Sequence, residues 1–258
     1  MPQKPHIALK NVHKHFGAKT VLDGVDLTLE RGRSLVVIGS SGSGKSVLLK
    51  CILGLLCADA GGITVDGAEM VGIHGREHRK ILAKCGVLFQ GGALFDSLTV
   101  WQNVAFGLIH AKGIAAGQAR EIALEKLAQV GLDGAVGGLS PAELSGGMQK
   151  RVALARAISC NPDIMFFDEP TSGLDPIMAD VIDRLIVDCV ERLGATAVSI
   201  THDMASVRRI ADRIAMLYKG HIIWEGAAED MDDSGNAYVK QFINARAQGP
   251  ISADRFGP

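Results

Sequence analysis

Residues 35–46 read Leu35-Val36-Val37-Ile38-Gly39-Ser40-Ser41-Gly42-Ser43-Gly44-Lys45-Ser46. The four apolar residues at the start indicate a strand buried on both faces, as in the parallel sheets of α/β proteins. The next eight residues match the pattern G-x-x-x-x-G-K-[ST], whose glycines let backbone N–H groups curl around phosphates at the start of a helix. A helical apolar pattern follows at Val47, Leu48, Ile52, Leu55 and Leu56. The stretch therefore predicts a strand, a phosphate-binding loop and a helix, in that order.

The loop predicts a site for the phosphates of a nucleotide. We expect Lys45 to neutralise the β- and γ-phosphates and Ser46 to bind Mg²⁺. The other loop residues would contribute their backbone: Gly39, Ser40, Ser41, Gly42, Ser43 and Gly44. A glycine-rich turn without a ligand is the alternative, and the strand and helix that flank the loop argue against it.

A second apolar run, residues 164–167, ends in Asp168-Glu169. Asp168 can hold Mg²⁺ through water, and the next carboxylate can face the γ-phosphate. Glu169 is thus the candidate general base for an attacking water molecule. Two adjacent acids alone would more often form a solvated turn, so this prediction depends on the phosphate loop.

Residues 144–149 read Leu144-Ser145-Gly146-Gly147-Met148-Gln149, where a hydroxyl and two glycines open a helix. They predict a second phosphate-sized helix N-terminus without a second lysine, and an ordinary helix cap is the alternative. The chain therefore carries two phosphate sites but one complete nucleotide site. A symmetric pair of chains resolves the mismatch if the Ser145 helix of each copy caps the γ-phosphate held by Lys45 of the other.

The remaining pattern predicts an α/β protein with one main domain in its 258 residues. Alternating apolar residues before Gly32 indicate an antiparallel layer, and residues 197–200 indicate another buried strand. Between Thr99 and Ser159 the spacing is helical, so a helical lobe is expected as an insertion in the α/β core. A short helix near the end carries an apolar stripe of Tyr238, Val239, Phe242 and Ile243. The stripe could pack on its own chain or on a neighbouring subunit, and we favour the second.

The composition argues against several classes of protein. No run reaches the roughly 18 apolar residues of a membrane-spanning helix, and the first stretch lacks the apolar block of a secretory signal, so we expect a soluble chain in the cytosol. The five cysteines are widely spaced and form no zinc pattern. A net charge of −1, with basic residues distributed along the chain, argues against a nucleic-acid partner.

Together these motifs make residues 7–226 resemble the nucleotide-binding subunit of ABC transporters. The resemblance implies a P-loop NTPase of ABC type, with a RecA-like core, an antiparallel β subdomain and an inserted helical subdomain. It implies an ATPase domain over residues 1–226, with the helical subdomain over about 99–160, and a C-terminal extension over 227–258. The implied cofactors are ATP and Mg²⁺, and the implied activity is ATP hydrolysis coupled to transport.

The resemblance also implies roles for single residues that the spacing alone does not suggest. Phe16 would stack on adenine, with a place in the core as the alternative. Gln90 would contact Mg²⁺ and the attacking water, and Asp175 would contact the second subunit. His202 would touch the γ-phosphate and fix the geometry around Glu169.

The segment from Gln90 to Val104 and the tail are similar to the ATPase subunit of Mla-type phospholipid transporters. This similarity implies a membrane permease docked on that segment, an MCE-domain lipid-binding protein in the same complex, and a peripheral place on the cytoplasmic side of the bacterial inner membrane. Leu94, Phe95 and Leu98 would form an apolar patch for a coupling helix of the permease. Packing of this patch inside the helical lobe is the alternative.

Two other functions stay open at this point. One is the ATPase subunit of an ABC importer for a polar solute such as an amino acid, because its nucleotide motifs would be identical. The other is a soluble ABC ATPase that acts on ribosomes or DNA. The single phosphate loop and the absence of a basic patch argue against the second function.

Overall fold

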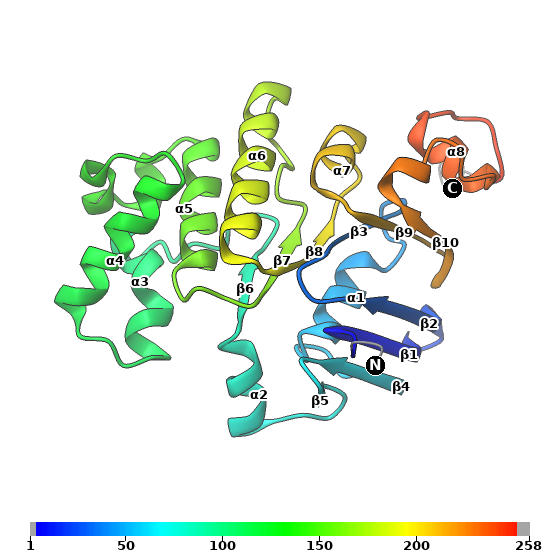
Figure 1. Cartoon of the computed structure of the whole chain (residues 1–258), viewed down its shortest axis with the longest axis horizontal. Coiled ribbons are helices and arrows are strands. Elements are labelled where there is room, and N and C mark those ends of the chain that lie inside the picture. The colour runs from blue at the N-terminus through cyan, green and yellow to red at the C-terminus, as the bar shows by residue number, and fades with distance from the viewer. Residues whose placement is uncertain (1–3, 252–258) are drawn as a thin grey trace.

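The computed structural model describes residues 4–251, which form two β-sheets and the helices around them (Figure 1). The first sheet is antiparallel, in the order β2-β1-β4-β5. Its strands are β1 (Ile7–Phe16), β2 (Lys19–Leu29), β4 (Ala60–Val65) and β5 (Ala68–Glu69). This sheet confirms the antiparallel layer that the alternating residues before Gly32 predict.

The second sheet has the order β10-β9-β3-β8-β7-β6 and is parallel except for the last hairpin, β9 with β10. Its strands are β3 (Ser34–Ile38), β6 (Cys85–Leu88), β7 (Ile164–Asp168), β8 (Thr196–Ile200), β9 (Arg213–Tyr218) and β10 (His221–Ala227). The carboxyl ends of parallel strands meet at one edge of a sheet. The loops after β3, β6, β7 and β8 therefore start along the same edge.

Strand β3 lies between β8 and β9 and is buried on both faces, as its apolar run predicts. Leu35 and Val37 belong to a core shared with the antiparallel sheet. Val36 and Ile38 belong to a second core on the opposite face of the parallel sheet. Successive side chains of a strand point to opposite faces, so this one strand joins both cores.

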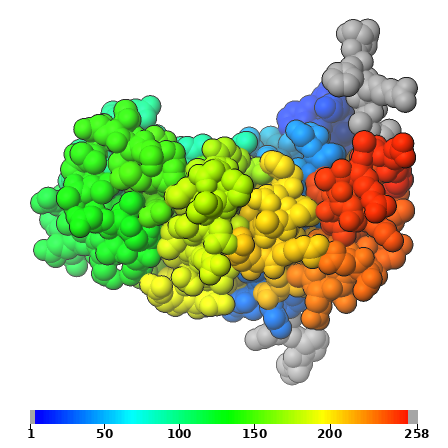
Figure 2. Space-filling model, turned by 90° about the horizontal axis from the view of Figure 1, so that it is seen from above, coloured from blue at the N-terminus to red at the C-terminus, as the bar shows by residue number. Residues whose placement is uncertain are grey.

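The helices divide between these cores. Helix α1 lies between the two sheets, and α6 and α7 cover the other face of the parallel sheet (Figure 1). Three more helices, α3, α4 and α5, pack on one another at one end of the molecule (Figures 1 and 2). The helices are α1 (Lys45–Ile52), α2 (Gly75–Leu82), α3 (Val100–His110), α4 (Ala116–Gln129), α5 (Gly146–Ile158), α6 (Pro176–Leu193), α7 (Met204–Ile210) and α8 (Ala237–Ile243), with short 3₁₀ turns at Gly134–Gly138, Pro141–Glu143 and Ala228–Asp230.

The segment that leads into α3 is held by one buried side chain, Asn103. Its Oδ1 accepts a hydrogen bond from the backbone N–H of Phe95 at 2.7 Å. Its Nδ2 lies 3.1 Å from the carbonyl oxygens of Phe95, Leu98 and Thr99. A buried amide with this many partners fixes the backbone of residues 95–99 against α3.

We expect Asn103→Leu to lower the free energy of unfolding by about 2–3 kcal/mol, because it leaves buried backbone groups without partners. Urea denaturation followed by circular dichroism measures the change. Asn244→Leu is the matched control, since Asn244 is exposed and bonds one carbonyl, that of Lys240. Equal losses in the two variants would show that Asn103 has no special part in holding this segment.

The C-terminal stripe packs on its own chain. Val239 is fully buried, and Tyr238, Phe242 and Ile243 pack against the core that lies between the parallel sheet and helices α6 and α7. The ring centroid of Tyr238 is 5.0 Å from that of Tyr218 on β9. The end of the parallel sheet thus offers the stripe an apolar surface within the same chain, and the favoured contact with a neighbouring subunit stays a prediction for the part-exposed Tyr238, Phe242 and Ile243.

Candidate active site

The phosphate loop joins the end of β3 to the start of α1, as predicted. Three of its glycines have positive φ: Gly39 at 152°, Gly42 at 74° and Gly44 at 106°. A Cβ atom at Gly39 would lie 2.3 Å from the carbonyl oxygen of Leu217, and one at Gly44 would lie 2.9 Å from that of Val21. These two positions therefore require glycine for both space and backbone conformation.

Lys45 lies inside the loop and is only 7% exposed. Its Nζ donates to the carbonyl oxygens of Gly39, at 2.7 Å, and Ser40, at 3.0 Å. Burial lowers the pKa of Lys45, while the nearby carboxylates of Glu169 and Asp168 act in the opposite direction. The loop thus holds a partly desolvated cation. Within residues 4–251, its ammonium group donates hydrogen bonds only to backbone carbonyls of the loop.

Ser46 and Asp168 bring two oxygen ligands together at the first turn of α1. The Oγ of Ser46 donates to Oδ1 of Asp168 at 3.2 Å. Asp168 is the last residue of β7, and burial raises the pKa of its carboxyl, while the hydrogen bond from Ser46 acts to lower it. A buried carboxylate beside a hydroxyl is a suitable pair of ligands for a hard divalent cation.

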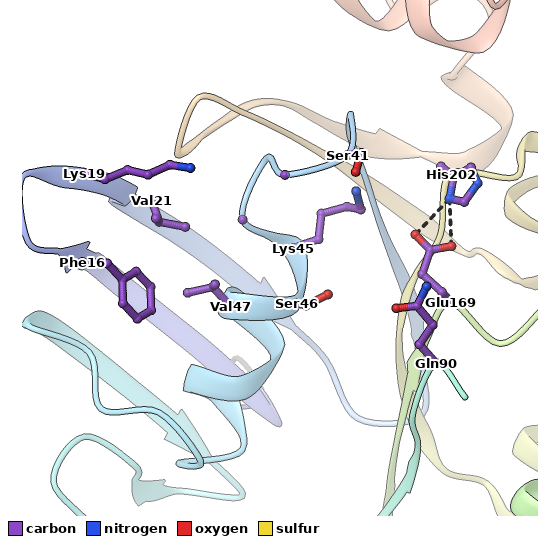
Figure 3. A pocket seen from close by; sticks show the side chains of 12 residues that line it. Phe16, Lys19, Val21, Ser41, Lys45, Ser46, Val47, Gln90, Glu169 and His202 are labelled. Atoms are coloured by element: carbon purple, nitrogen blue, oxygen red, sulfur yellow. Dashed lines mark hydrogen bonds and ion pairs between the residues drawn. The ribbon is translucent and has the colours of Figure 1, made fainter. Parts of the chain in front are cut away.

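Glu169 and His202 face each other across the carboxyl ends of two neighbouring strands. The Nδ1 atom of His202 lies 3.0 Å from Oε1 and 2.9 Å from Oε2 of Glu169 (Figure 3). The backbone of Glu169 has a φ of 50°, which costs a non-glycine residue about 1–2 kcal/mol. It is held there by its N–H bond to the carbonyl of Ile200 and by the Oγ of Ser172, which donates to its carbonyl at 2.9 Å. The carboxylate points toward His202 and lines the same cavity as the phosphate loop (Figure 3).

A cavity of about 760 Å³ connects these groups. Lys45 and Ser46 form one wall, and Gln90, Glu169 and His202 form the facing wall (Figure 3). Predicted residues thus come together from the end of β1, the phosphate loop and the segments that follow β6, β7 and β8. The full lining is Phe16, Lys19, Val21, Ser41, Gly42, Gly44, Lys45, Ser46, Val47, Gln90, Glu169 and His202.

Phe16 ends β1 and lines this cavity, and the residue is 49% exposed. The Nζ of Lys14 lies 5.5 Å from the ring centroid. The alternative prediction, that Phe16 is a core residue, is therefore wrong. An exposed aromatic face at the rim of a cavity is available for stacking on a planar ring.

Three further lining residues were absent from the sequence prediction: Lys19, Val21 and Val47. Val21 and Val47 carried only the apolar periodicity of a strand and a helix, which is also the pattern of core residues. Lys19 follows the turn after Phe16, and nothing in its local sequence distinguishes it from a solvated lysine. Only the position of β1 and β2 beside the phosphate loop places these side chains at the cavity.

Eight predicted residues are absent from this lining, and four of them, Gly39, Ser40, Ser43 and Asp168, belong to the phosphate loop or bond to Ser46 beside it. The other four lie at the starts of α5 and α6. Ser145 caps α5, where its Oγ accepts from the N–H of Met148 at 3.3 Å, and Gly146 and Gly147 form the first turn. Asp175 caps α6 by accepting from the N–H groups of Ile177 and Met178. The two helix starts are in contact, since a Cβ atom at Gly147 would lie 2.7 Å from Cε of Met178.

Comparison with known proteins places these motifs in one family. The family model described as "ABC transporter" matches residues 22–172. The "Probable ribonucleotide transport ATP-binding protein mkl" of Mycobacterium tuberculosis is 39% identical over 97% of this chain and 69% of its own length. The "Intermembrane phospholipid transport system ATP-binding protein MlaF" of Haemophilus influenzae is 38% identical over 95% of this chain and 92% of its own length.

The fold agrees with a solved structure of the same family. The ATP-binding cassette MJ0796, in a dimeric post-hydrolysis state with ADP and Pi, is 34% identical and superposes with a TM-score of 0.79. That match covers 86% of this chain and 98% of MJ0796. The predicted P-loop fold of ABC type is thus confirmed. This chain belongs to the ABC transporter family and is an ATP-binding, ATP-hydrolysing cassette.

Proposed function

We propose that this chain powers the transport of phospholipid between membranes, as the ATPase subunit of a complex. The observation that carries the proposal is the likeness to the phospholipid transport protein MlaF, which extends over 92% of that protein's length. The ribonucleotide transport protein mkl is equally similar by identity, but the match leaves out about a third of it. Its name supports the alternative function, the ATPase of a transporter for a polar solute.

In the hydrolysis that we propose, Glu169 accepts the proton of the attacking water and His202 holds the carboxylate in place. The contacts of 2.9 and 3.0 Å between His202 and Glu169 support this role for the histidine. Lys45 and the N–H groups of the loop bind the β- and γ-phosphates. Gln90, on the same wall as Glu169, orients the water, and Phe16 stacks on the adenine.

We propose Mg²⁺ as the second cofactor, bound by Ser46, Gln90 and Asp168. Ser46 and Asp168 fit such an ion because they already place two oxygens 3.2 Å apart. Between residues 4 and 251 there is no group of three or more His, Cys, Asp or Glu side chains that could hold a metal. This suits an ion that takes most of its ligands from phosphates and water. When bound, it supplies positive charge opposite the phosphates of ATP.

We propose that a second copy of the chain completes the site. Ser145 and Asp175 lie at adjoining helix starts, are exposed, and are absent from the lining of the nucleotide cavity. Ile177, two residues after Asp175, is 77% exposed, as expected for an apolar side chain that a partner covers. The dimeric state of MJ0796 supports this arrangement, in which Ser145, Gly146 and Gly147 of one copy reach the γ-phosphate held by the other.

We propose that the membrane permease docks on the segment from Gln90 to Val104. Phe95 is 43% exposed, and its ring centroid lies 4.6 Å from that of Phe106 on α3. The segment is therefore an ordered surface with an accessible aromatic side chain, which supports the docking of a short helix. An MCE-domain protein in the same complex, and a place on the cytoplasmic face of the inner membrane, belong to the same proposal.

None of the helices between residues 4 and 251 has the length and apolar character needed to cross a bilayer. For the domain boundaries we propose the ATPase domain at residues 1–226, with the helical subdomain at about 99–160, and the extension at 227–258. Helices α3, α4 and α5 fall in the proposed subdomain, and α8 falls in the extension. Residues 1–3 and 252–258 lie outside the described part of the chain.

The experiment that tests this function is purification of the tagged, full-length chain from membranes in mild detergent. Mass spectrometry then identifies the proteins and lipids that accompany it. We expect a permease, an MCE-domain protein and bound phospholipid. A solute permease without lipid would overturn the lipid assignment in favour of the polar-solute importer, and ribosomal proteins or DNA would overturn the transport function.

A further inference from the structure

Lys150, in the second turn of α5, is a buried cation without a hydrogen-bond partner among the described residues. Its side chain belongs to the buried face of α5, and the residue is only 7% exposed. Among residues 4–251, no hydrogen-bond acceptor is in reach of its fully buried Nζ atom. An ammonium group in this position has lost water without gaining a carboxylate, a carbonyl or a hydroxyl in exchange.

The surroundings of Lys150 connect it to the catalytic acids. It lines a second cavity, of about 450 Å³, together with Gln90 and Ser172. Gln90 also lines the nucleotide cavity, and Ser172 donates a hydrogen bond to the carbonyl of Glu169. Burial lowers the pKa of Lys150, whereas the carboxylates of Asp168 and Glu169 act to raise it. The unpaired ammonium therefore lines the same cavity as Gln90, a residue of the nucleotide cavity, and Ser172, which bonds the backbone of Glu169.

A role in stability does not account for this lysine. Removing water from a charge costs several kcal/mol unless good partners replace it, and apolar residues of similar volume often stabilise a protein in such a place. Lys126 on α4 shows the ordinary arrangement, since it is equally buried, at 7% exposed, but its Nζ donates to Oδ1 of Asn161 at 2.8 Å. An unpaired buried charge that lowers stability is most readily explained by function.

We propose that Lys150 is a positioning residue for ATP hydrolysis, whose positive charge on α5 acts on the Asp168–Glu169 carboxylates from the cavity that it lines with Gln90 and Ser172. Lys45 approaches the same two acids from within the loop. Two adjacent carboxylates beside a triphosphate repel both each other and the phosphates, and a nearby cation offsets that repulsion. The inference rests on the proposed role of Glu169 as the general base.

The test is Lys150→Met in the full-length chain, purified in the complex that holds it. Methionine has a similar volume without the charge. We expect kcat for ATP hydrolysis to fall by about 10- to 100-fold, because the charge acts on the reacting groups, while KM for ATP stays within about threefold. We expect the Tm to be unchanged or higher. Lys150→Arg, which keeps the charge, should retain kcat within about threefold.

Lys126→Met is the matched control, and it should lower the Tm without lowering kcat, because that lysine has partners and lines neither cavity. A Lys150→Met enzyme with wild-type kcat would overturn the inference, whatever its Tm. So would a Lys150→Arg enzyme as slow as Lys150→Met. Glu169→Gln in the same assay separates the two proposals, since wild-type turnover in that variant would overturn the base assignment itself.

Discussion

Glu169→Gln is expected to bind ATP with an affinity close to that of the wild-type protein but to hydrolyse it about 10²–10⁴ times more slowly. Glutamine keeps the size of the side chain and an oxygen that can accept a hydrogen bond from His202, which lies 2.9–3.0 Å from the carboxylate. It cannot accept the proton of the attacking water. The loss should therefore appear in kcat, because the interaction that is removed operates only in the transition state.

Single-turnover hydrolysis and equilibrium binding of a fluorescent ATP analogue measure the two quantities separately. Glu77→Gln is the control, since Glu77 is exposed on α2 and lies outside the cavity lining. It should change neither quantity. If Glu169→Gln turned over ATP near the wild-type rate, another residue would have to be the base.

Lys45→Ala should lose nucleotide binding itself. The ammonium group lies inside the phosphate loop, bonded to the carbonyls of Gly39 and Ser40, and its charge is opposite to that of the phosphates it would meet. Each hydrogen bond to a charged group contributes about 1.5–3 kcal/mol, so we expect the Kd for ATP to rise at least about 100-fold. Isothermal titration calorimetry with ATP and Mg²⁺ measures this change.

The folded structure should survive the Lys45→Ala substitution, because the variant removes a buried charge and leaves the backbone of the loop in place. A Tm close to the wild-type value would show that binding was lost in a folded protein. Lys10→Ala, at an exposed position on β1, should leave the Kd unchanged. Tight ATP binding by Lys45→Ala would contradict the placement of the phosphates in this loop.

Long-range features of the site escaped prediction from residue patterns alone. Gln90 follows β6, whose four residues, Cys85-Gly86-Val87-Leu88, are too few and too mixed to show strand periodicity. Its assignment needed the family resemblance. Lys150 escaped notice because a lysine on an amphipathic helix is usually solvated. Its burial depends on the surrounding tertiary structure, which the spacing within α5 does not reveal.

Features built from consecutive residues could be predicted from the sequence. The phosphate loop could be identified because its strand, glycines, lysine and first helical turn are consecutive, and because three of its glycines adopt backbone conformations that other residues avoid. The buried strands β3 and β7 could be identified because both of their faces are covered and their apolar runs are continuous, and β8 because Ser199 alone interrupts the apolar residues 197–200.

Which of these segments meet depends on the complete fold. The order β3-β8-β7-β6 brings residues from four distant parts of the chain to one sheet edge, and places Gln90, Glu169 and His202 opposite Lys45. The packing of α8 on β9 and the burial of Lys150 likewise depend on surfaces that form when separate segments come together. Local spacing specifies the face that a helix or strand presents, and the free energy of burial in the complete fold selects the surface that covers it.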